Sequence, residues 1–513
     1  MKLGNVLAAN AGRFPDQVAA ICQDRKITFG ELDERANRLA NALHARGVKI
    51  GDRIVINLPN GLELVEAMAG VLKSGAVMVP LSTRLTANEV AYIVSDCEPA
   101  AMIYTEDLRP QAAVALESMP GALRLIVGAA VEGEETFKAF VESGASQPPP
   151  ALSIATDDCV IGYTSGTTGR PKGAVSTHAN IIVAHGFMNA LEWELTQRDV
   201  ILATTPMAHR TGLGRLANMF YLGCRVVMQP RFDAAEAVDL IEREKVTVIG
   251  GVPTIVRMLL PEFEKRPDVG KSLRLIVATG EVFPVPLKQR LRQRLPHVGL
   301  YSFLAQTESG FVAGLRPDEQ LKKPAALGRP VPGVEVRLAD VAGNEVAKGE
   351  AGEILVRCGQ PGHGTVMREY FRNPEATKAS FVGEWFRTGD VGYFDDDGFL
   401  YFADRAKDMI VTGGLNVYSK EVELTLQEHA AVEDAAVIGM PDDEFGESVV
   451  ACIVLRKGQE ASAEDLIEHC RRRIASYKKP KHVHFISELP RNATGKVVKP
   501  ELKRRFAQQY VKA

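Results

Sequence analysis

The regular alternation of helical and strand-like segments is what most constrains the fold of this chain. Apolar residues recur at helical spacing over Phe29–Ala45, and a short β-branched run follows at 53–57. A helix is predicted over 61–73 and a strand over 76–81. Similar strand-like runs return at 225–228, 246–249 and 273–278. This rhythm predicts an α/β fold in which mixed, mostly parallel sheets are flanked by helices.

The pattern changes after about residue 325. Glycine-punctuated β alternation over Gly333–Arg357 predicts a small β subdomain. Beyond Asp404 the pattern is α+β, with a helix expected over 419–429, for which Ser419 is the predicted N-cap, and another over 463–475. We therefore expect a large N-terminal domain and a small α+β C-terminal domain of about 110 residues.

Composition excludes several classes of protein. The 513 residues are 46% hydrophobic and 24% charged, which is typical of a globular protein and not of a disordered or membrane-embedded one. The 61 basic residues nearly balance the 64 acidic ones, so dedicated nucleic-acid binding is not expected. Seven cysteines without a CxxC pair argue against a zinc ribbon or a disulfide framework. Together with an N-terminus that lacks an apolar stretch, this predicts a cytoplasmic protein with no integral membrane segment.

The segment from Tyr163 to Gly173, YTSGTTGRPKG, carries the strongest chemical signal. Its glycines expose backbone N–H groups, its hydroxyls can donate to phosphate oxygens and Lys172 adds a positive charge. This combination predicts a phosphate-binding loop. The segment is not the P-loop of NTPases, because no Gly-x4-Gly-Lys-Ser/Thr string occurs in the chain.

A second glycine motif, from Gly212 to Ala217, matches the dinucleotide fingerprint GxGxxG/A. Its context is wrong, because seven residues separate it from the preceding strand-like run at 200–204. We therefore interpret these glycines as positions where a helix packs closely against its neighbours.

Five further motifs follow. They are Gln306-Thr307-Glu308, Arg387-Thr-Gly-Asp390, Asp404-Arg-Ala-Lys-Asp408, Gly413-Gly414-Leu-Asn416 and Asn492-Ala-Thr-Gly-Lys496. Together with the Tyr163 segment they make the chain resemble the adenylate-forming superfamily over essentially its whole length. The chain is most similar to acyl-CoA synthetases of the fatty-acyl and aryl type.

The resemblance implies an AMP-forming acyl-CoA ligase that uses Mg²⁺-ATP and CoA. A carboxylate would attack the α-phosphate of ATP to give acyl-AMP and pyrophosphate, and CoA would then displace AMP. Three alternatives remain open: an adenylation enzyme that loads an acyl carrier protein, luciferase-type oxygenation and a non-enzymatic binder. The implied partners are a small carboxylic acid, ATP and CoA, with no nucleic acid, and a homodimer is left open.

The resemblance also implies roles for individual residues. Lys496 would bridge the substrate carboxylate and the α-phosphate, Glu308 and Thr164 would lie near Mg²⁺, and Asp390 would bind the ribose. The expected catalytic residues are Lys496, Lys172, Glu308 and Thr307. The expected ATP-binding residues are Thr164, Ser165, Gly166, Thr167, Thr168, Gly169, Lys172, Gly280, Glu281, Thr307, Asp390, Arg405 and Lys496.

The acyl pocket is expected at His209, Arg210, Gly251 and Leu304. Leu304 stands where the family has an aromatic residue that stacks on adenine, so Phe303 or Tyr301 is an alternative for that contact. Arg210 and Arg215 are unusual for the family at these positions. Either arginine could face the pocket and pair with a polar or anionic group of the substrate, or point outward into a surface salt bridge.

The resemblance divides the chain into an ATP- and acyl-binding domain at 1–403, a hinge at 404–408 and a mobile lid at 409–513. Lys407 is the expected hinge residue, and Gly413 with Gly414 would line the CoA tunnel. The stretch from Arg471 to the C-terminus contains 13 basic residues and two acidic ones, whereas the stretch 421–468 is acidic. We interpret the basic stretch as a field that attracts the phosphates of ATP and CoA.

Overall fold

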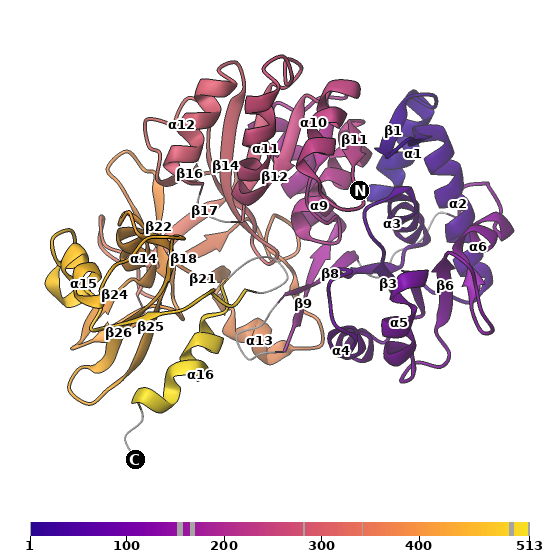
Figure 1. Ribbon diagram of the computed structural model, residues 1–513. Helices are drawn as coiled ribbons and strands as arrows, with labels where there is room; N and C mark the ends of the chain where they lie inside the picture. Colours follow the sequence, from indigo (N-terminus) through magenta and orange to yellow (C-terminus); the bar gives the residue numbers. More distant parts are fainter. Residues whose placement is uncertain are drawn as a thin grey trace. The chain divides into compact units, whose positions relative to one another are not determined.

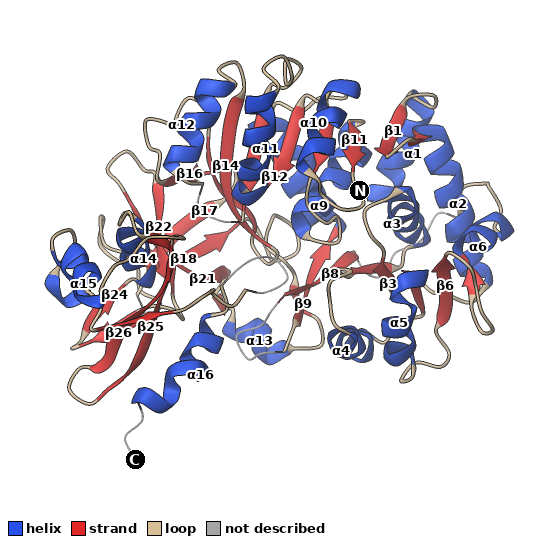
Figure 2. Ribbon diagram, in the orientation of Figure 1, coloured by secondary structure: helices blue, strands red, loops and turns tan. Residues whose placement is uncertain are grey.

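The computed structural model describes residues 2–150, 157–164, 170–280, 283–340, 342–491 and 497–510 (Figure 1). The chain divides into two compact units. One comprises Met1–Val336 with Val356–Thr388, and the other comprises Arg337–Leu355 with Gly389–Ala513. Both units combine helices and sheets (Figure 2), so the predicted α/β architecture is confirmed.

The first unit contains an eight-stranded sheet with the order β19-β9-β8-β4-β3-β5-β6-β7. Strands β3 to β6 are parallel, whereas β8 and β9 form an antiparallel hairpin. The strands are β3 (Arg53–Asn57), β4 (Val77–Pro80), β5 (Ala101–Thr105), β6 (Leu123–Val127), β7 (Glu135–Thr136), β8 (Asp158–Thr164), β9 (Lys172–Thr177) and β19 (Glu369–Tyr370).

Helices cover both faces of this sheet because its central strands are apolar on both sides. Ile54 and Ile56 of β3 join the core on one face, and Val55 joins the core on the other. The first face carries α2 (Phe29–Ala45), α3 (Leu62–Ser74) and α6 (Phe137–Ser143), and the second carries α4 (Ala87–Cys97) and α5 (Arg109–Leu116).

A second sheet of the first unit has the order β16-β15-β14-β13-β12-β10-β11-β1-β2. The strands from β14 to β1 along this order are parallel neighbours. They are β1 (Val18–Cys22), β2 (Arg25–Thr28), β10 (Val200–Ala203), β11 (Arg225–Met228), β12 (Val248–Gly251), β13 (Leu275–Thr279), β14 (Gly299–Gln306), β15 (Gly310–Leu315) and β16 (Ala326–Pro330).

The two faces of this second sheet belong to different cores. One face packs against α10 (Ala234–Arg243), α11 (Pro253–Lys265) and α12 (Val285–Arg294), which Figure 2 shows over the strands. The other face shares a core with α1 (Leu3–Arg13), α9 (Arg210–Leu222) and the eight-stranded sheet. The remaining elements are α7 (His178–Ile181), the π-helix η2 (Ile182–Phe187), α8 (Met188–Trp193), α13 (Pro374–Ala379), β20 (Phe381–Val382) and the 3-10 helix η1 (Glu106–Leu108).

The second unit has two sheets, and its boundary passes through β17, β18 and β21. One sheet has the order β17-β18-β21-β22, and the other has the order β24-β23-β26-β25 with β27 beside β26. The elements are β17 (Glu335–Ala339), β18 (Gly352–Arg357), β21 (Trp385–Phe394), β22 (Leu400–Arg405), β23 (Ile410–Thr412), β24 (Leu415–Val417), α14 (Ser419–Gln427), β25 (Val432–Asp442), β26 (Gly446–Leu455), α15 (Ala463–Arg471), η3 (Ser476–Lys478), β27 (His482–Phe485) and α16 (Lys499–Tyr510).

One local prediction was wrong. Ser419 is the first residue of α14 and Tyr418 is its N-cap, without a side-chain cap. The Ser419 hydroxyl donates to the Asp404 carboxylate at 3.0 Å instead, and the Ser419 N–H donates to the same carboxylate. A carboxylate at the end of β22 therefore caps this helix, which no local sequence rule could reveal.

Two further observations concern the cysteines and the helices. All seven cysteines are free and buried, which confirms that the chain is not a disulfide framework. Among the residues placed by the structure, no helix combines the length and apolar character needed to cross a bilayer.

The close packing of α3 on α2 gives a stability prediction. A Cβ at Gly70 would lie 2.5 Å from the side chain of Leu39, whereas a Cβ at Gly12 meets no atom within 4 Å. We expect Gly70→Ala to lower the free energy of unfolding by about 1–3 kcal/mol through overpacking. Gly12→Ala should keep or raise stability, because alanine favours a helix. Urea denaturation of both variants tests this, and equal midpoints would contradict it.

Buried His178 gives a pH prediction. Burial, with the Lys2 ammonium nearby, lowers the pKa of His178 to about 4, and its Nδ1 accepts the N–H of Leu3 at 3.3 Å. The unfolded chain therefore binds this proton first, so stability falls as the pH drops from about 6.5 toward 4, by at most about 3 kcal/mol. We expect His178→Asn to flatten this slope in denaturation measured between pH 7 and 5. The exposed His297→Asn should keep it.

Candidate active site

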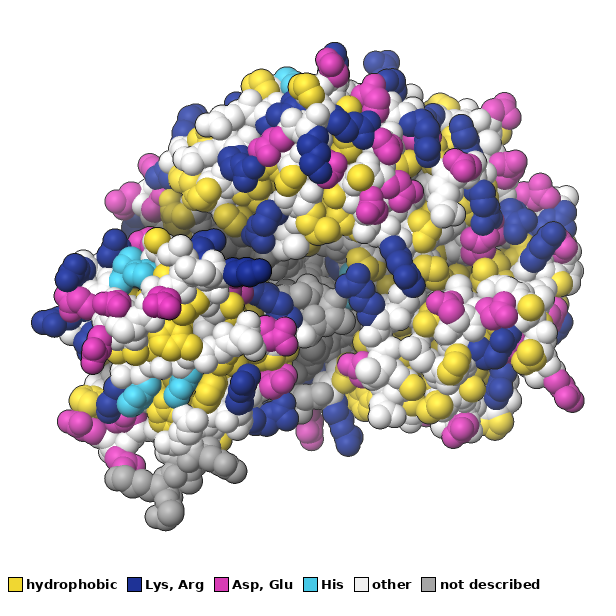
Figure 3. All heavy atoms as spheres, in the orientation of Figure 1, with side chains coloured by type: hydrophobic (Ala, Val, Ile, Leu, Met, Phe, Trp, Pro, Cys, Tyr) yellow, Lys and Arg dark blue, Asp and Glu magenta, His cyan; other side chains and the backbone are white. Residues whose placement is uncertain are grey.

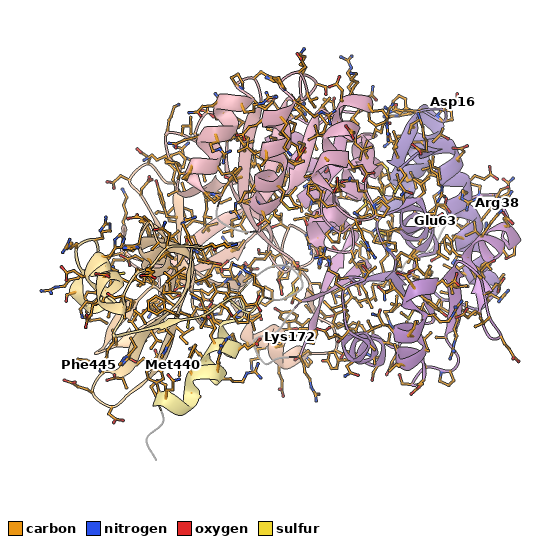
Figure 4. The ribbon with its side chains drawn as sticks, in the orientation of Figure 1. Asp16, Arg38, Glu63, Lys172, Met440 and Phe445 are labelled. Carbon is orange, nitrogen blue, oxygen red and sulfur yellow. The ribbon has the colours of Figure 1, made fainter. Side chains whose placement is uncertain are left out.

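The predicted phosphate loop connects the two strands of the β8–β9 hairpin. Thr164 ends β8 and pairs directly with Lys172. Lys172, which is labelled in Figure 4, begins β9. The intervening Ser165, Gly166, Thr167, Thr168 and Gly169 lie outside the described residues. The hairpin thus places Thr164 and Lys172 side by side at the two ends of the loop.

Glu308 lies in the tight turn between β14 and β15 and meets this hairpin. The Thr164 hydroxyl donates to Glu308 Oε1 at 2.8 Å, and the Tyr370 hydroxyl donates to the same oxygen at 3.2 Å. The ammonium of Lys172 lies 5.3 Å from the centre of the Tyr370 ring. Thr164, Lys172 and Glu308, which lie far apart in the sequence, are therefore brought together.

Two glycines allow this close approach. A Cβ at Gly162 of β8 would lie 3.0 Å from the Thr307 side chain. Gly310, which follows the turn, has φ +67° and leaves only 2.6 Å between a Cβ and the Thr365 carbonyl oxygen. A Cβ at Gly162 would crowd the Thr307 methyl group, whereas Gly310 needs glycine both for space and for its backbone conformation.

Sequence reasoning did not find Tyr370. It reaches the site because β19 pairs with β9, an association between segments almost 200 residues apart. Burial and the neighbouring Glu308 carboxylate raise the pKa of the Tyr370 phenol. The phenol therefore stays protonated and donates its hydrogen bond to Glu308.

The donor set around Glu308 fits Mg²⁺. Oxygen ligands suit this hard cation, which proteins usually hold through one or two carboxylates together with substrate phosphates. Glu308 Oε2 forms no hydrogen bond with the residues that the structure describes, so it is available to a cation. The same residues include no cluster of three or more His, Cys, Asp or Glu side chains suited to a metal. The phosphates of ATP would therefore supply most of the remaining ligands.

Arg210 points inward and forms no salt bridge with the described residues, so the outward alternative is wrong for it, and its contact with the substrate stays a prediction. Its Nη1 donates to the Thr307 carbonyl oxygen and to Ser176 Oγ, both at 2.8 Å. Its Nε donates to His185 Nε2 at 3.3 Å. Burial lowers the pKa of Arg210 to about 10. The arginine thus joins the start of α9 to β9 and to the turn that carries Glu308.

The other residues expected at the acyl pocket and the adenine lie in the first unit. His209 is the N-cap of α9, Gly251 ends β12 and Leu304 lies in β14. A Cβ at Gly251 would lie 2.5 Å from Thr204 Oγ1. Gly280, with φ +91°, directly follows β13, and its neighbour Glu281 lies outside the described residues.

The two aromatic alternatives for stacking on adenine are held elsewhere. Tyr301 and Phe303 lie two residues apart in β14, on the face opposite to Leu304. Their rings pack with Trp193 and Phe311. Tyr301 is fully buried, and its hydroxyl donates to Glu192 Oε2 at 2.6 Å. Both rings belong to this aromatic core, which argues against either contacting adenine.

Close packing explains the glycines of the dinucleotide-like motif, as predicted. They lie inside α9. A Cβ at Gly212 would lie 2.3 Å from Met207 Cα, and one at Gly214 would lie 2.8 Å from His185 Nδ1.

In the second unit, Asp390 and Arg405 face each other. They are register partners in the β21–β22 pair, and Arg405 Nε lies 2.7 Å from Asp390 Oδ1. Asp390 is only 2% exposed. The ion pair keeps this buried carboxylate oriented as a hydrogen-bond acceptor.

The expected hinge and tunnel residues also lie in the second unit. Lys407 is exposed in the turn after β22. Gly413 and Gly414, with φ +57° and +79°, form the two-residue turn of the β23–β24 hairpin. Positive φ at both positions is the signature of a type I′ turn, so glycine is required here for backbone reasons as well. Lys496, the expected catalytic lysine, lies outside the described residues.

Part of the basic C-terminal stretch is neutralised locally. Its lysines and arginines form ion pairs with the acidic stretch that precedes it. The pairs are Arg473–Glu428, Lys478–Glu421, Lys481–Asp442, Arg491–Asp434 and Lys499–Glu423. Figure 3 likewise shows Lys and Arg side chains interspersed with Asp and Glu over the visible face. The predicted phosphate-attracting field is therefore weaker than the sequence count indicates.

Two family models match the chain, one over its N-terminal part and one over its C-terminal part. The model of the AMP-binding enzyme matches residues 7–371, and that of the AMP-binding enzyme C-terminal domain matches residues 421–496. The first match includes the phosphate loop and Glu308, and the second ends at Lys496.

Individual relatives extend over almost the whole chain. A long-chain-fatty-acid–CoA ligase of Mycobacterium tuberculosis is 35% identical, with 94% of each chain covered. A fatty acid–acyl-carrier-protein ligase of Streptomyces coeruleorubidus is 34% identical and covers 96% of this chain and 94% of its own. The solved structure of ATP-bound MatB from Rhodopseudomonas palustris matches with a TM-score of 0.89 at 30% identity, covering 100% of both chains.

The contacts of Glu308 give a test of the site. We expect Glu308→Gln to slow acid- and ATP-dependent pyrophosphate release by about 100-fold or more, because a neutral amide loses the charge that favours Mg²⁺. It should also raise the Mg²⁺ concentration needed for half-maximal rate. Glu369→Gln, in neighbouring β19, removes a partly exposed ion pair with Arg368 and should stay within about twofold. Equal rates for the two variants would contradict this placement.

Proposed function

This chain belongs to the AMP-binding enzyme family, as an AMP-forming acid–thiol ligase, and we propose how its residues divide the reaction. A carboxylic acid and Mg²⁺-ATP give an acyl-adenylate and pyrophosphate, and CoA then takes the acyl group as a thioester. The observation that carries the assignment of residues is the hydrogen bond from Thr164 to Glu308. It joins the phosphate loop to the carboxylate suited to Mg²⁺.

The chemistry explains why these groups converge. The attacking carboxylate and the triphosphate repel each other, so positive charge must be concentrated in a site with little water. Lys172 and the loop after Thr164 would hold the β- and γ-phosphates, and Thr307 would contact the nucleotide beside Glu308. Mg²⁺, held by Glu308, Thr164 and the phosphates, would supply charge neutralisation when bound.

The second unit would complete the reaction. Asp390, held by Arg405, would accept hydrogen bonds from the ribose hydroxyls. Lys496 would bridge the substrate carboxylate and the α-phosphate during adenylation. The lid at 409–513 would then rotate against the domain at 1–403 about the hinge at 404–408, with Lys407 as the hinge residue. This rotation would switch the enzyme from the first half-reaction to the second. The turn at Gly413 and Gly414 would line the path of the CoA thiol arm.

A carrier protein is the second candidate acceptor, because one relative is named as an acyl-carrier-protein ligase. It shares the adenylation chemistry and differs only in the thiol. We also propose a cytoplasmic location, which the seven free cysteines support. A homodimer stays a prediction.

The acceptor is tested by a single assay. Pyrophosphate and thioester are measured with ATP, Mg²⁺ and a panel of alkyl, aryl and dicarboxylic acids, with CoA, with a holo acyl carrier protein or with neither. We expect acid-dependent pyrophosphate release in every arm and thioester with CoA. If a thioester forms only with the carrier protein, the carrier protein and not CoA is the acceptor. If no acid gives pyrophosphate, the proposed function is refuted.

A further inference from the structure

Helix α9 carries two inward-pointing arginines without a salt bridge to any described residue, of which Arg215 is buried and Arg210 is half-buried. Arg215 is only 3% exposed, and Arg210 is tied into the interior by Ser176 and Thr307. Neither forms a salt bridge with the residues that the structure describes. The buried carboxylates of this unit are, by contrast, paired with partly exposed arginines: Asp199 with Arg274, Glu192 with Arg316 and Glu66 with Arg35.

The contacts of Arg215 use few of the hydrogen-bond donors of its guanidinium group. Nη1 donates to Asn218 Oδ1 at 3.3 Å, and Cζ lies 4.6 Å from the centre of the Trp193 ring. A guanidinium carries N–H donors on all three nitrogens, so most of these donors have no protein acceptor among the described residues. Nη2 of Arg210 is likewise buried without a hydrogen-bond partner.

The group between the two arginines adds no compensating charge. His185, from the π-helix η2, accepts a hydrogen bond from Arg210 Nε. Burial and the two guanidinium groups hold the pKa of His185 well below its ordinary value, so the ring is neutral. Burial also lowers the pKa of Arg215 to about 10, which still leaves it charged near neutral pH. The Glu308 carboxylate acts on Arg210 without forming a salt bridge, whereas no described acidic side chain acts on Arg215. The charge of Arg215 is thus removed from water without a negative one, which is costly unless an anion binds.

These arginines lie where the acid is expected. Arg210 binds the carbonyl of Thr307, next to Glu308. Arg215 packs on the end of β12: its Nε would lie 2.9 Å from a Cβ at Gly250, the neighbour of Gly251. Carboxyl ends of parallel strands form the ligand crevice of open α/β sheets. Arg215 follows Arg210 by five positions in α9, a rise of about 7.5 Å along the axis. A substrate whose reacting end lies near Thr307 would therefore meet Arg215 further along its own chain.

We propose that the acid activated by this enzyme carries a second carboxylate, and that Arg215, assisted by Arg210, binds that carboxylate. A guanidinium recognises a carboxylate through parallel N–H donors, which Arg215 has to spare. Gly250 provides the space that the guanidinium occupies. This inference rests on the proposed function and specifies its substrate as a dicarboxylic acid.

The wild-type enzyme provides the first test. Pyrophosphate release is measured for dicarboxylic acids of three to eight carbons, for the monoamide of each and for the monocarboxylic acid of equal length. The monoamide keeps the shape and removes only the second charge. We expect kcat/KM for the best dicarboxylic acid to exceed that of its monoamide by about 100-fold or more.

Variants assign the preference to Arg215. In Arg215→Met the preference for the dicarboxylic acid over its monoamide should fall below about threefold, mainly through KM, while the monocarboxylic acid stays within about threefold of wild type. Arg215→Lys should keep part of the preference, because it retains the charge but not the fork. Arg257→Met, an exposed arginine on α11, is the control and should keep the full preference.

Each result decides one point. A wild-type enzyme that prefers monocarboxylic acids or monoamides overturns the second carboxylate while leaving the proposed function intact. Pyrophosphate release with none of the acids refutes the proposed function itself. If Arg215→Met loses activity with all acids equally, Arg215 is a packing residue against Trp193 and its assignment is wrong. The same conclusion follows if Arg215→Met does not fold and Arg215→Lys loses both its thermal midpoint and the preference for dicarboxylic acids that the wild type shows.

Discussion

The active-site geometry of the first unit depends on the contact between its two sheets at Arg210. One nitrogen of this guanidinium binds Ser176 of the eight-stranded sheet and the carbonyl of Thr307, which follows β14 of the other sheet. The hydrogen bond between Thr164 and Glu308 crosses between the same two sheets. A shift of one sheet against the other would separate the phosphate loop from the carboxylate suited to Mg²⁺. The shared apolar core between the sheets resists such a shift, because close-packed interiors transmit displacement and do not absorb it.

The fold was largely predictable because its strands are short, apolar and bounded by turn residues. The predicted helix at Phe29–Ala45 and the strands at 53–57 and 225–228 match α2, β3 and β11 without a residue of difference. Lys172, Glu308 and the segment around them could be singled out as candidates, since each belongs to a motif that is continuous in sequence, and their roles stay predictions. Family membership then followed from the same motifs.

What the sequence could not provide depends on pairing between distant segments. Tyr370 reaches Glu308 only through the pairing of β19 with β9, and it belongs to none of the motifs. Asp404 replaces the expected cap of Ser419 because β22 ends beside α14. The count of basic residues from Arg471 onward predicted a positive electrostatic field, but several of these side chains form ion pairs with the preceding acidic stretch. A charge count along the chain cannot distinguish these cases, because it contains no distances.

For a buried arginine, the groups that its side chain meets determine what its charge costs. Arg274 keeps its charge at low cost because Asp199 accepts two of its hydrogen bonds. Arg215 has no such partner among the described residues, yet it is the more buried of the two. An uncompensated buried cation costs stability in the ligand-free protein, and that cost is recovered only by a ligand that brings the missing anion. An uncharged acyl chain cannot provide this compensation. Burying Arg215 beside the substrate site therefore lowers the affinity for neutral acyl groups and raises that for an anionic one, and discrimination follows from both differences.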